Sequence, residues 1–342
     1  MSRSFFSWRN EFASGVVLLE IDPERPTTSS RMVQIPTFYD PGFAAPIGAH
    51  VMPMEKFARV ADGLRLMSGV RLSVPPPATA DDLQRVHTLA YIEAIRSGTP
   101  QVLAESQKFP WSPQLYPSVC LTNGGVIAAA GCALDGGLAA AVASGFHHAH
   151  ADHGEGFCTF NGLIVALERL RVESRIRSAA ILDFDLHYGN GTASLVATRP
   201  WIRALSVYGN DYAANRAYAD VATRLHEDGE NHFSLPLRAG CQQAEHLEQL
   251  HRGLDWMMQG GRPDVVIYQA GADPYREDPY SPLDLGIEDL WERDREIFRF
   301  ARRHRLPLAW VLAGGYTSDL RKVVEIHLNT FRAALEVYGT RT

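Results

Sequence analysis

The sequence predicts a single α/β domain whose central, mainly parallel β-sheet is covered by helices on both faces. Two observations carry this prediction. After residue 137, short apolar runs alternate with helical segments, and this alternation requires right-handed crossovers over both faces of a parallel sheet. In addition, 46% of the 342 residues are hydrophobic, enough for a large core. No linker, repeat or charge block divides the chain.

Helices are predicted to dominate the first hundred residues. Apolar side chains recur there at helical spacing, at Met54, Phe57, Ala61, Leu64 and Met67. Thr79 is a residue type that caps helix amino termini, and it follows a proline-rich stretch at residues 75–77. A helix of small residues over 124–133 is expected to stop at Asp135-Gly136-Gly137.

Strands are expected at the apolar runs 138–143, 179–184, 202–207, 265–269 and 308–312. Helical segments at 163–170, 244–256 and 287–300 lie between them. In a parallel sheet of this kind, ligands bind beyond the carboxyl ends of the strands. The polar residues that follow each run are therefore expected to converge on one site.

Charge and composition exclude several classes of protein. The net charge of −6 argues against a nucleic-acid-binding surface. The amino terminus lacks the pattern of a secretory signal, and no later stretch is expected to be long and apolar enough to span a membrane. No Cys-x-x-Cys pair occurs among the four cysteines, Cys120, Cys132, Cys158 and Cys241. We therefore expect free thiols in a reducing compartment and a cytoplasmic protein without nucleic-acid or membrane partners.

Residues that carry chemistry follow four of the apolar runs. Residues 145–148 are Gly-Phe-His-His, and residues 183–192 read DFDLHYGNGT. The run at 265–269 leads to Asp273, and the last run leads to Gly314-Gly315-Tyr316. Three histidines, three aspartates and a tyrosine are thus expected at one edge of the sheet, on glycine-rich turns.

Each of these motifs alone has an ordinary structural explanation. A histidine pair occurs by chance at strand ends, an Asp-x-Asp-x-His run caps a helix, and Gly-Gly-Tyr forms a turn beside a packed aromatic ring. Their joint occurrence after four strands favours function, because four coincidences would otherwise be needed. Two aspartates and a histidine form an oxygen-rich zinc site with open positions, typical of a catalytic metal. A nearby histidine can accept a proton, and a tyrosine hydroxyl can stabilise an oxyanion.

The same motifs resemble the histone deacetylase/acetylpolyamine amidohydrolase superfamily from about Thr37 onward. HVMPMEKF at 50–57, GFHHAHADHGEGFCTFN, DFDLHYGNGT, QAGAD and GGY match it in order and spacing. The resemblance implies the arginase/deacetylase fold, with an amino-terminal extension at 1–36 and a catalytic domain at 37–342. HADHGEGFC, VVIYQAGAD and Arg293-Asp294 are most similar to class IV-like histone deacetylases and related bacterial enzymes.

The resemblance also implies roles for individual residues. The ligands of one catalytic Zn²⁺ would be Asp185, His187 and Asp273. His148 would be the general base, His147 its electrostatic partner and Tyr316 the oxyanion donor, while Asp183 would orient His147. A structural K⁺ would be held by the side chains of Asp183 and Ser206 and the main-chain carbonyls of Asp183, Asp185, His187 and Val207. The substrate tunnel would be walled by Gly156 and Phe157, with Tyr212 and Tyr280 as further candidates.

Three departures from the family pattern affect the prediction. Asn190, which would neighbour the base, stands where several members have an aspartate, and a neutral partner should leave His148 less easily protonated. Ala313 replaces the first of three glycines before the tyrosine and is expected to stiffen that loop. Residues 208–220 lack the Phe-Pro-Gly rim of many members.

Arginases share the fold and bind two manganese ions. The corresponding second-metal positions hold Gly189 and Gly271 here, so one metal ion per chain is expected. The substrate is predicted to be an N-acyl-lysine, with an acylated polyamine as the alternative. The class IV resemblance indicates acyl groups longer than acetyl, although large rings at the tunnel would instead restrict it to acetyl. An inactive acyl-lysine-binding module is disfavoured, because no metal ligand and no tyrosine has been lost.

Overall fold

Eight parallel strands form the central sheet of the computed structural model, which describes residues 34–211, 216–217 and 229–339. Their spatial order is β2-β1-β3-β10-β9-β4-β5-β8, and every neighbouring pair is parallel. The strands are β1 (Ile35–Phe38), β2 (Val70–Ser73), β3 (Leu138–Ser144), β4 (Ala179–Asp183), β5 (Ile202–Tyr208), β8 (His232–Pro236), β9 (Val265–Ala270) and β10 (Leu308–Leu312). Two short strands, β6 (Asn210–Asp211) and β7 (Arg216–Ala217), form a separate antiparallel pair. The predicted α/β architecture is confirmed.

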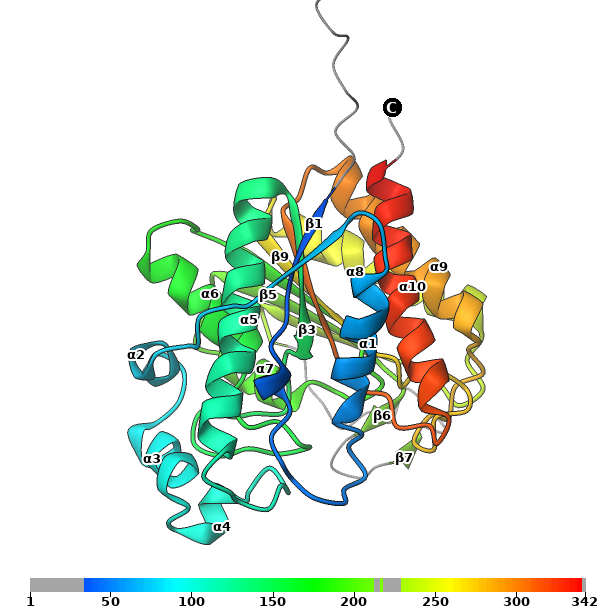
Figure 1. Ribbon diagram of the computed structural model, residues 1–342. Helices are drawn as coiled ribbons and strands as arrows, with labels where there is room; N and C mark the ends of the chain where they lie inside the picture. The colour runs from blue at the N-terminus through cyan, green and yellow to red at the C-terminus, as the bar shows by residue number, and fades with distance from the viewer. Residues whose placement is uncertain (1–33, 212–215, 218–228, 340–342) are drawn as a thin grey trace, which may run out of the picture. The chain divides into compact units, whose positions relative to one another are not determined.

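Helices cover both faces of the sheet (Figure 1). One face carries α5 (Leu115–Gly136) and α6 (Gly162–Val172), and the other carries α1 (Glu55–Arg65), α8 (Gln243–Gln259), α9 (Ile287–Arg303) and α10 (Leu320–Gly339). The shorter helices are η1 (Pro41–Phe43), α2 (Ala80–Gln84), α3 (Leu89–Ser97), α4 (Gln101–Ala104) and α7 (Asn190–Val196). Strands β3, β4, β9 and β10 are buried along their whole length, because helices cover both of their faces. This double burial explains their continuous apolar sequences.

Helix α5 is the long core helix of the domain. It begins nine residues before the predicted start, at Leu115, and ends at Gly136, followed by the C-cap Gly137 in the left-handed conformation with φ of 89°. Gly124 lets it approach the proline-rich stretch, since a Cβ there would lie 2.0 Å from the carbonyl oxygen of Pro76. By length and composition α5 could cross a membrane, so the expectation that no segment qualifies was wrong. However, 67% of its apolar window is buried inside the protein, as in a core helix.

Helices dominate the described part of the first hundred residues, as predicted, but two short strands also occur there. Helix α1 forms where the apolar spacing predicted it, and Thr79 caps α2 in a reciprocal capping box with Asp82. Strands β1 and β2 were missed because each has only four residues, and β2 is a half-exposed edge strand. Strand β8 and helix α10 were also not predicted. All four cysteines are free thiols, as expected.

The expected domain boundary at residue 37 lies within β1, which starts at Ile35. Most of the expected amino-terminal extension, residues 1–33, lies outside the described residues.

Candidate active site

The candidate site lies at the carboxyl ends of the four central strands, β3, β10, β9 and β4. These strands are direct neighbours in the sheet. His147 and His148 follow β3, Asp183 ends β4, Asp273 follows β9 and Tyr316 follows β10. The predicted convergence of these motifs is therefore a consequence of strand order, since parallel neighbours present their carboxyl ends at one edge.

Asp185, His187 and Asp273 form a buried triad. The exposed fractions of these residues are 3%, 8% and 0%. Nδ1 of His187 lies 3.2 Å from Oδ1 of Asp185 and 3.2 Å from Oδ2 of Asp273. One ligand-type atom from each residue lies within 4.8 Å of the others. The structure thus brings the three predicted zinc ligands together.

Backbone amides hold both carboxylates of the triad in place. Asp185 accepts hydrogen bonds from the amides of Gly314 and His187, at 2.8 and 2.9 Å. Asp273 accepts one from the amide of Leu186 at 3.0 Å. Burial lowers the pKa of His187, but the hydrogen bonds and charges of the two aspartates outweigh this effect and raise its pKa to about 10. The pocket therefore favours positive charge at this point, which fits a divalent cation.

The two adjacent histidines have different partners. Nδ1 of His147 lies 2.7 Å from Oδ2 of Asp183, and Nδ1 of His148 lies 2.7 Å from Oδ1 of Asn190. Burial and the charges of His147 and His187 hold the pKa of His148 well below its usual range. Burial also lowers the pKa of His147, but Asp183 and Asp185 outweigh it and raise that pKa. His148 is thus the neutral imidazole of the pair.

Tyr316 is fixed by an aspartate that the sequence analysis missed. The amide of Tyr316 donates to Oδ2 of Asp278 at 2.6 Å, and the amide of Tyr280 donates to Oδ1 of the same carboxylate at 3.1 Å. The ring of Tyr280 lies edge-on to those of Tyr316 and His187, with centroid distances of 5.3 and 6.0 Å. Burial, followed by the charges of Asp273 and Asp185, raises the pKa of the Tyr316 hydroxyl well above its usual value. The hydroxyl therefore remains a hydrogen-bond donor.

Lys56 is a second residue that the sequence analysis missed. It lies on α1, is fully buried, and donates from Nζ to the carbonyl oxygen of Ala313 at 2.7 Å. Its Nζ also lies 5.6 Å from the ring centroid of Tyr316. Burial lowers its pKa to about 8 although Asp273 and Asp185 oppose this shift. Lys56 thus anchors the loop that carries Tyr316.

The Arg293-Asp294 pair connects the loops after β4 and β9. Nη1 of Arg293 donates to the carbonyl oxygens of Gly271 and Phe184, at 2.8 and 3.3 Å. Its Nε lies 2.9 Å from Oδ1 of Asp294, and both residues are fully buried. The pair therefore holds the loops that carry Asp185 and Asp273 at a fixed separation.

Aromatic side chains surround Phe157, a predicted wall of the substrate tunnel. The ring of Phe157 stacks on Phe109 at 5.7 Å, and it lies 4.8 Å from His50 and 6.3 Å from Tyr316. Gly156 and Phe157 both have positive φ, 50° and 65°. An apolar cavity of about 30 Å³ adjoins this wall, and its lining includes Phe43, Met52, Phe57, Phe109, Phe146 and Phe157. Among the tunnel candidates, Gly156, Phe157 and Tyr280 lie in the described residues, whereas Tyr212 lies outside them.

Three of the predicted potassium ligands lie on the neighbouring strands β4 and β5. The β4–β5 register places Asp183 opposite Ser206, and Val207 follows in β5. Oγ of Ser206 is buried and has no hydrogen-bond partner among the described residues. A cation coordinated by hydroxyl and carbonyl oxygens would give the Ser206 hydroxyl an interaction partner.

The fold and the site define a hydrolase of the arginase/deacetylase fold. The histone deacetylase domain family matches residues 50–331. This match covers most of the chain, so the chain belongs to the histone deacetylase family. The predicted superfamily is confirmed, whereas the class IV-like assignment stays a prediction.

Several proteins are similar to this chain over most of its length. An uncharacterized protein of Picosynechococcus sp. is 30% identical over 310 residues, which cover 89% of this chain and 99% of that protein. Histone deacetylase 2 of Arabidopsis thaliana is 28% identical over 304 residues, 84% of this chain and 74% of that protein. The crystal structure of an acetylpolyamine aminohydrolase from Burkholderia pseudomallei matches with a TM-score of 0.73 and 21% identity, covering 89% of this chain and 99% of that one. At this identity, the structural likeness concerns the fold.

Gly314→Ala should impair metal binding more than folding. A Cβ at Gly314 would lie 1.9 Å from Oδ2 of Asp273, so this carboxylate would have to move away from His187. We expect a loss of bound zinc, measured by elemental analysis, with circular dichroism close to wild type. Gly136→Ala is the matched control, because nothing lies within 4 Å of its Cβ position. Wild-type zinc affinity in Gly314→Ala would contradict the assignment of Asp273.

Asn190→Asp should move the acidic limb of the pH–rate profile to higher pH. A carboxylate at 2.7 Å from His148 favours its protonated form and raises its pKa, so less neutral base is present at a given pH. Because Asn190 also contacts Glu155 at 2.6 Å, the change is best made with Glu155→Gln and compared with Glu155→Gln alone. An acidic limb that stays in place or moves down would contradict the role of His148 as the base.

Proposed function

We propose that this protein is a zinc-dependent deacylase that hydrolyses the amide bond of N-acyl-lysine. The observation that carries the proposal is the buried triad Asp185, His187 and Asp273 beside a neutral His148 and a protonated Tyr316. Two carboxylates and an imidazole are suitable zinc ligands, and three protein ligands leave a position open for reaction.

Each residue of the site has a distinct role in the proposed reaction. Zn²⁺ bound by the triad would polarise the amide carbonyl and lower the pKa of water to about 7. His148 accepts a proton from the attacking water, since its low pKa keeps the imidazole neutral beforehand. His147 lies beside it as its electrostatic partner, with a pKa that Asp183 and Asp185 raise. The Tyr316 hydroxyl donates a hydrogen bond to the developing oxyanion.

The retained catalytic set argues against an inactive acyl-lysine-binding module. Such a module has no need for a metal triad, a base and an oxyanion donor together. Here each of these groups has its own positioning contacts, including those from Lys56 and Asp278. We therefore assign the site to catalysis.

The small apolar cavity favours short acyl groups. Its volume of about 30 Å³ compares with the roughly 10–15 Å³ that one water molecule needs, so the cavity is small. A long acyl chain would have to displace Phe157 or its neighbours, although each methylene buried there would contribute about 0.8 kcal/mol. We propose acetyl-lysine and short homologues as substrates.

A structural potassium ion is proposed at Asp183 and Ser206. The unsatisfied Ser206 hydroxyl and the adjoining main-chain carbonyls supply oxygen ligands of the required kind. Bound there, the ion would stabilise the loop that carries Asp185 and His187.

Asp185→Ala should abolish both zinc binding and hydrolysis. The variant removes a ligand and leaves the remaining carboxylate and histidine without a complete site. Zinc content and deacetylation of an acetyl-lysine peptide are measured together. Asp62→Ala serves as the control, because Asp62 is an exposed aspartate on α1. Full activity of Asp185→Ala would refute the proposal.

Tyr316→Phe should reduce kcat about 10²–10³-fold with a much smaller effect on KM. The ring and its packing against Tyr280 are kept, so the variant removes only the hydroxyl. Steady-state kinetics of the zinc-loaded enzyme test this expectation. An unchanged kcat would exclude Tyr316 from the reaction.

A homologous substrate series tests the proposed acyl preference. We expect kcat/KM to be highest between acetyl- and butyryl-lysine peptides and to fall for octanoyl- and myristoyl-lysine. A kcat/KM that rises toward myristoyl-lysine would mean that the aromatic wall opens. In that case the class IV resemblance would predict the substrate better than the size of the cavity does. Acetylated polyamines are included, and activity on them alone would favour an acetylpolyamine amidohydrolase.

A further inference from the structure

The loop after β3 carries a second group of metal-ligand side chains. We propose that His150, His153 and Glu155 bind a divalent transition-metal ion such as Zn²⁺, at a site separate from the catalytic triad. This proposal does not rest on the proposed function. It also differs from the second-metal position of arginases, where this chain has Gly189 and Gly271.

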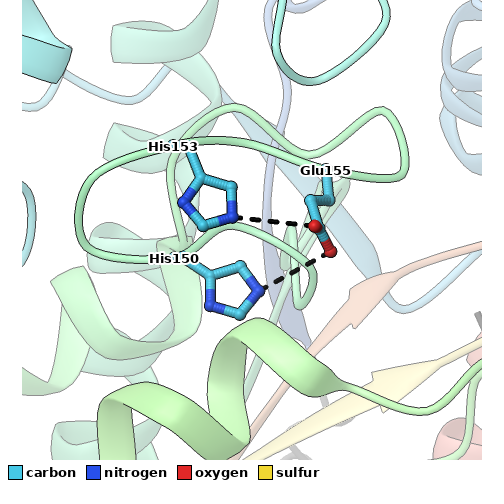
Figure 2. A group of neighbouring side chains, drawn as sticks. All are labelled: His150, His153 and Glu155. Atoms are coloured by element: carbon cyan, nitrogen blue, oxygen red, sulfur yellow. Dashed lines mark ion pairs between the residues drawn. The ribbon is translucent and has the colours of Figure 1, made fainter. Parts of the chain in front are cut away.

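Both histidines direct the same ring nitrogen toward one carboxylate (Figure 2). Nε2 of His150 lies 3.6 Å from Oε2 of Glu155, and Nε2 of His153 lies 3.6 Å from Oε1. The rings are stacked nearly parallel, with centroids 4.5 Å apart. Zinc–nitrogen bonds of about 2.0–2.1 Å put the ligand atoms of a tetrahedral site about 3.4 Å apart. The two nitrogen–oxygen distances of 3.6 Å are close to this value, and one ligand atom from each of the three residues lies within 4.8 Å of the others.

The hydrogen bonds of the other ring nitrogens fix the tautomers. Oγ of Ser194 donates to the carbonyl oxygen of Gly191 at 2.8 Å, so it accepts from Nδ1 of His150 at 2.9 Å. Nδ1 of His153 donates to Oδ1 of Asp152 at 2.7 Å. In both histidines the lone pair is therefore on Nε2, the atom that faces Glu155. An acceptor on the far nitrogen is the usual arrangement behind a metal-ligating histidine.

Access and loop geometry also suit an exchangeable ion. The side chains of His150, His153 and Glu155 are 19%, 39% and 33% exposed, so water can complete the coordination. The amide of His150 donates to the carbonyl oxygen of His153 at 2.9 Å, which closes the turn between the two ligands.

The site is connected to the catalytic base by one side chain. Nδ2 of Asn190 donates to Oε2 of Glu155 at 2.6 Å and lies 3.2 Å from Nε2 of His150, while its Oδ1 contacts His148. An ion at Glu155 and His150 competes with Asn190 for both acceptors. We therefore expect the ion to bind more weakly here than at the catalytic triad. A bound ion would lie next to the side-chain amide of Asn190 and would weaken its hydrogen bond to Glu155.

Calorimetric titration of Zn²⁺ into metal-free, tag-free protein tests the proposal. We expect a tight class of one ion and a weaker class of one further ion per chain. His153→Ala and Glu155→Gln should each lose the weaker class and keep the tight one. Asp152→Asn should keep the weaker class of sites, with an affinity reduced about 10-fold or more, because it alters the partner of His153 Nδ1. His251→Ala is the matched control, since His251 is an exposed histidine paired with Glu296.

Two outcomes would overturn the proposal. One is a single class of sites in the wild type, and the other is a weaker class that survives in both His153→Ala and Glu155→Gln. Circular dichroism confirms the folding of each variant. Asp185→Ala separates this proposal from the proposed function, because it should lose the tight class and retain the weaker one.

Discussion

Two aspartate carboxylates, Asp185 and Asp273, face one histidine nitrogen in a pocket that excludes solvent. Burying a charge that lacks compensation costs several kcal/mol even after the protein relaxes. The pocket therefore requires positive charge, and without a metal ion His187 itself takes up a proton at neutral pH, with a pKa of about 10. A divalent cation satisfies the same requirement and leaves the imidazole neutral as a ligand. Backbone amides and two buried cations surround this concentration of negative charge.

Two buried cations reinforce the site. Lys56 approaches from α1 and Arg293 from α9, and each donates to main-chain carbonyls of loops at the sheet edge. Neither makes a direct ion pair with a triad carboxylate among the described contacts. Because their charges attract the carboxylates while their donors bind carbonyl oxygens, they hold the loops without occupying ligand positions. This arrangement keeps the triad oxygens available for a metal.

The site could be predicted from the sequence where its residues are local to strand ends. His147, His148, Asp185, His187 and Asp273 follow apolar runs within a few positions, and a parallel sheet brings such ends together. Lys56 and Asp278 could not be predicted in this way. The burial of Lys56 depends on the packing of α1 against α10 and on a loop more than 250 residues away. The role of Asp278 depends on the path of the loop after β10. The four central strands could be predicted because each is a continuous apolar run in the sequence. Strands β1 and β2 could not, because each has only four residues.

The residue at position 190 shows how one choice constrains its neighbours. Its side chain must accept from Nδ1 of His148 and donate to the Glu155 carboxylate, at 2.7 and 2.6 Å. The amide does both, whereas an ionised aspartate in this place would only accept and would bring two carboxylates into contact. Asparagine is therefore compatible with Glu155 beside it. A neutral asparagine leaves His148 less basic than an aspartate would. Because Asn190 contacts both His148 and Glu155, a change in the loop at His150–Glu155 is expected to alter the basicity of His148.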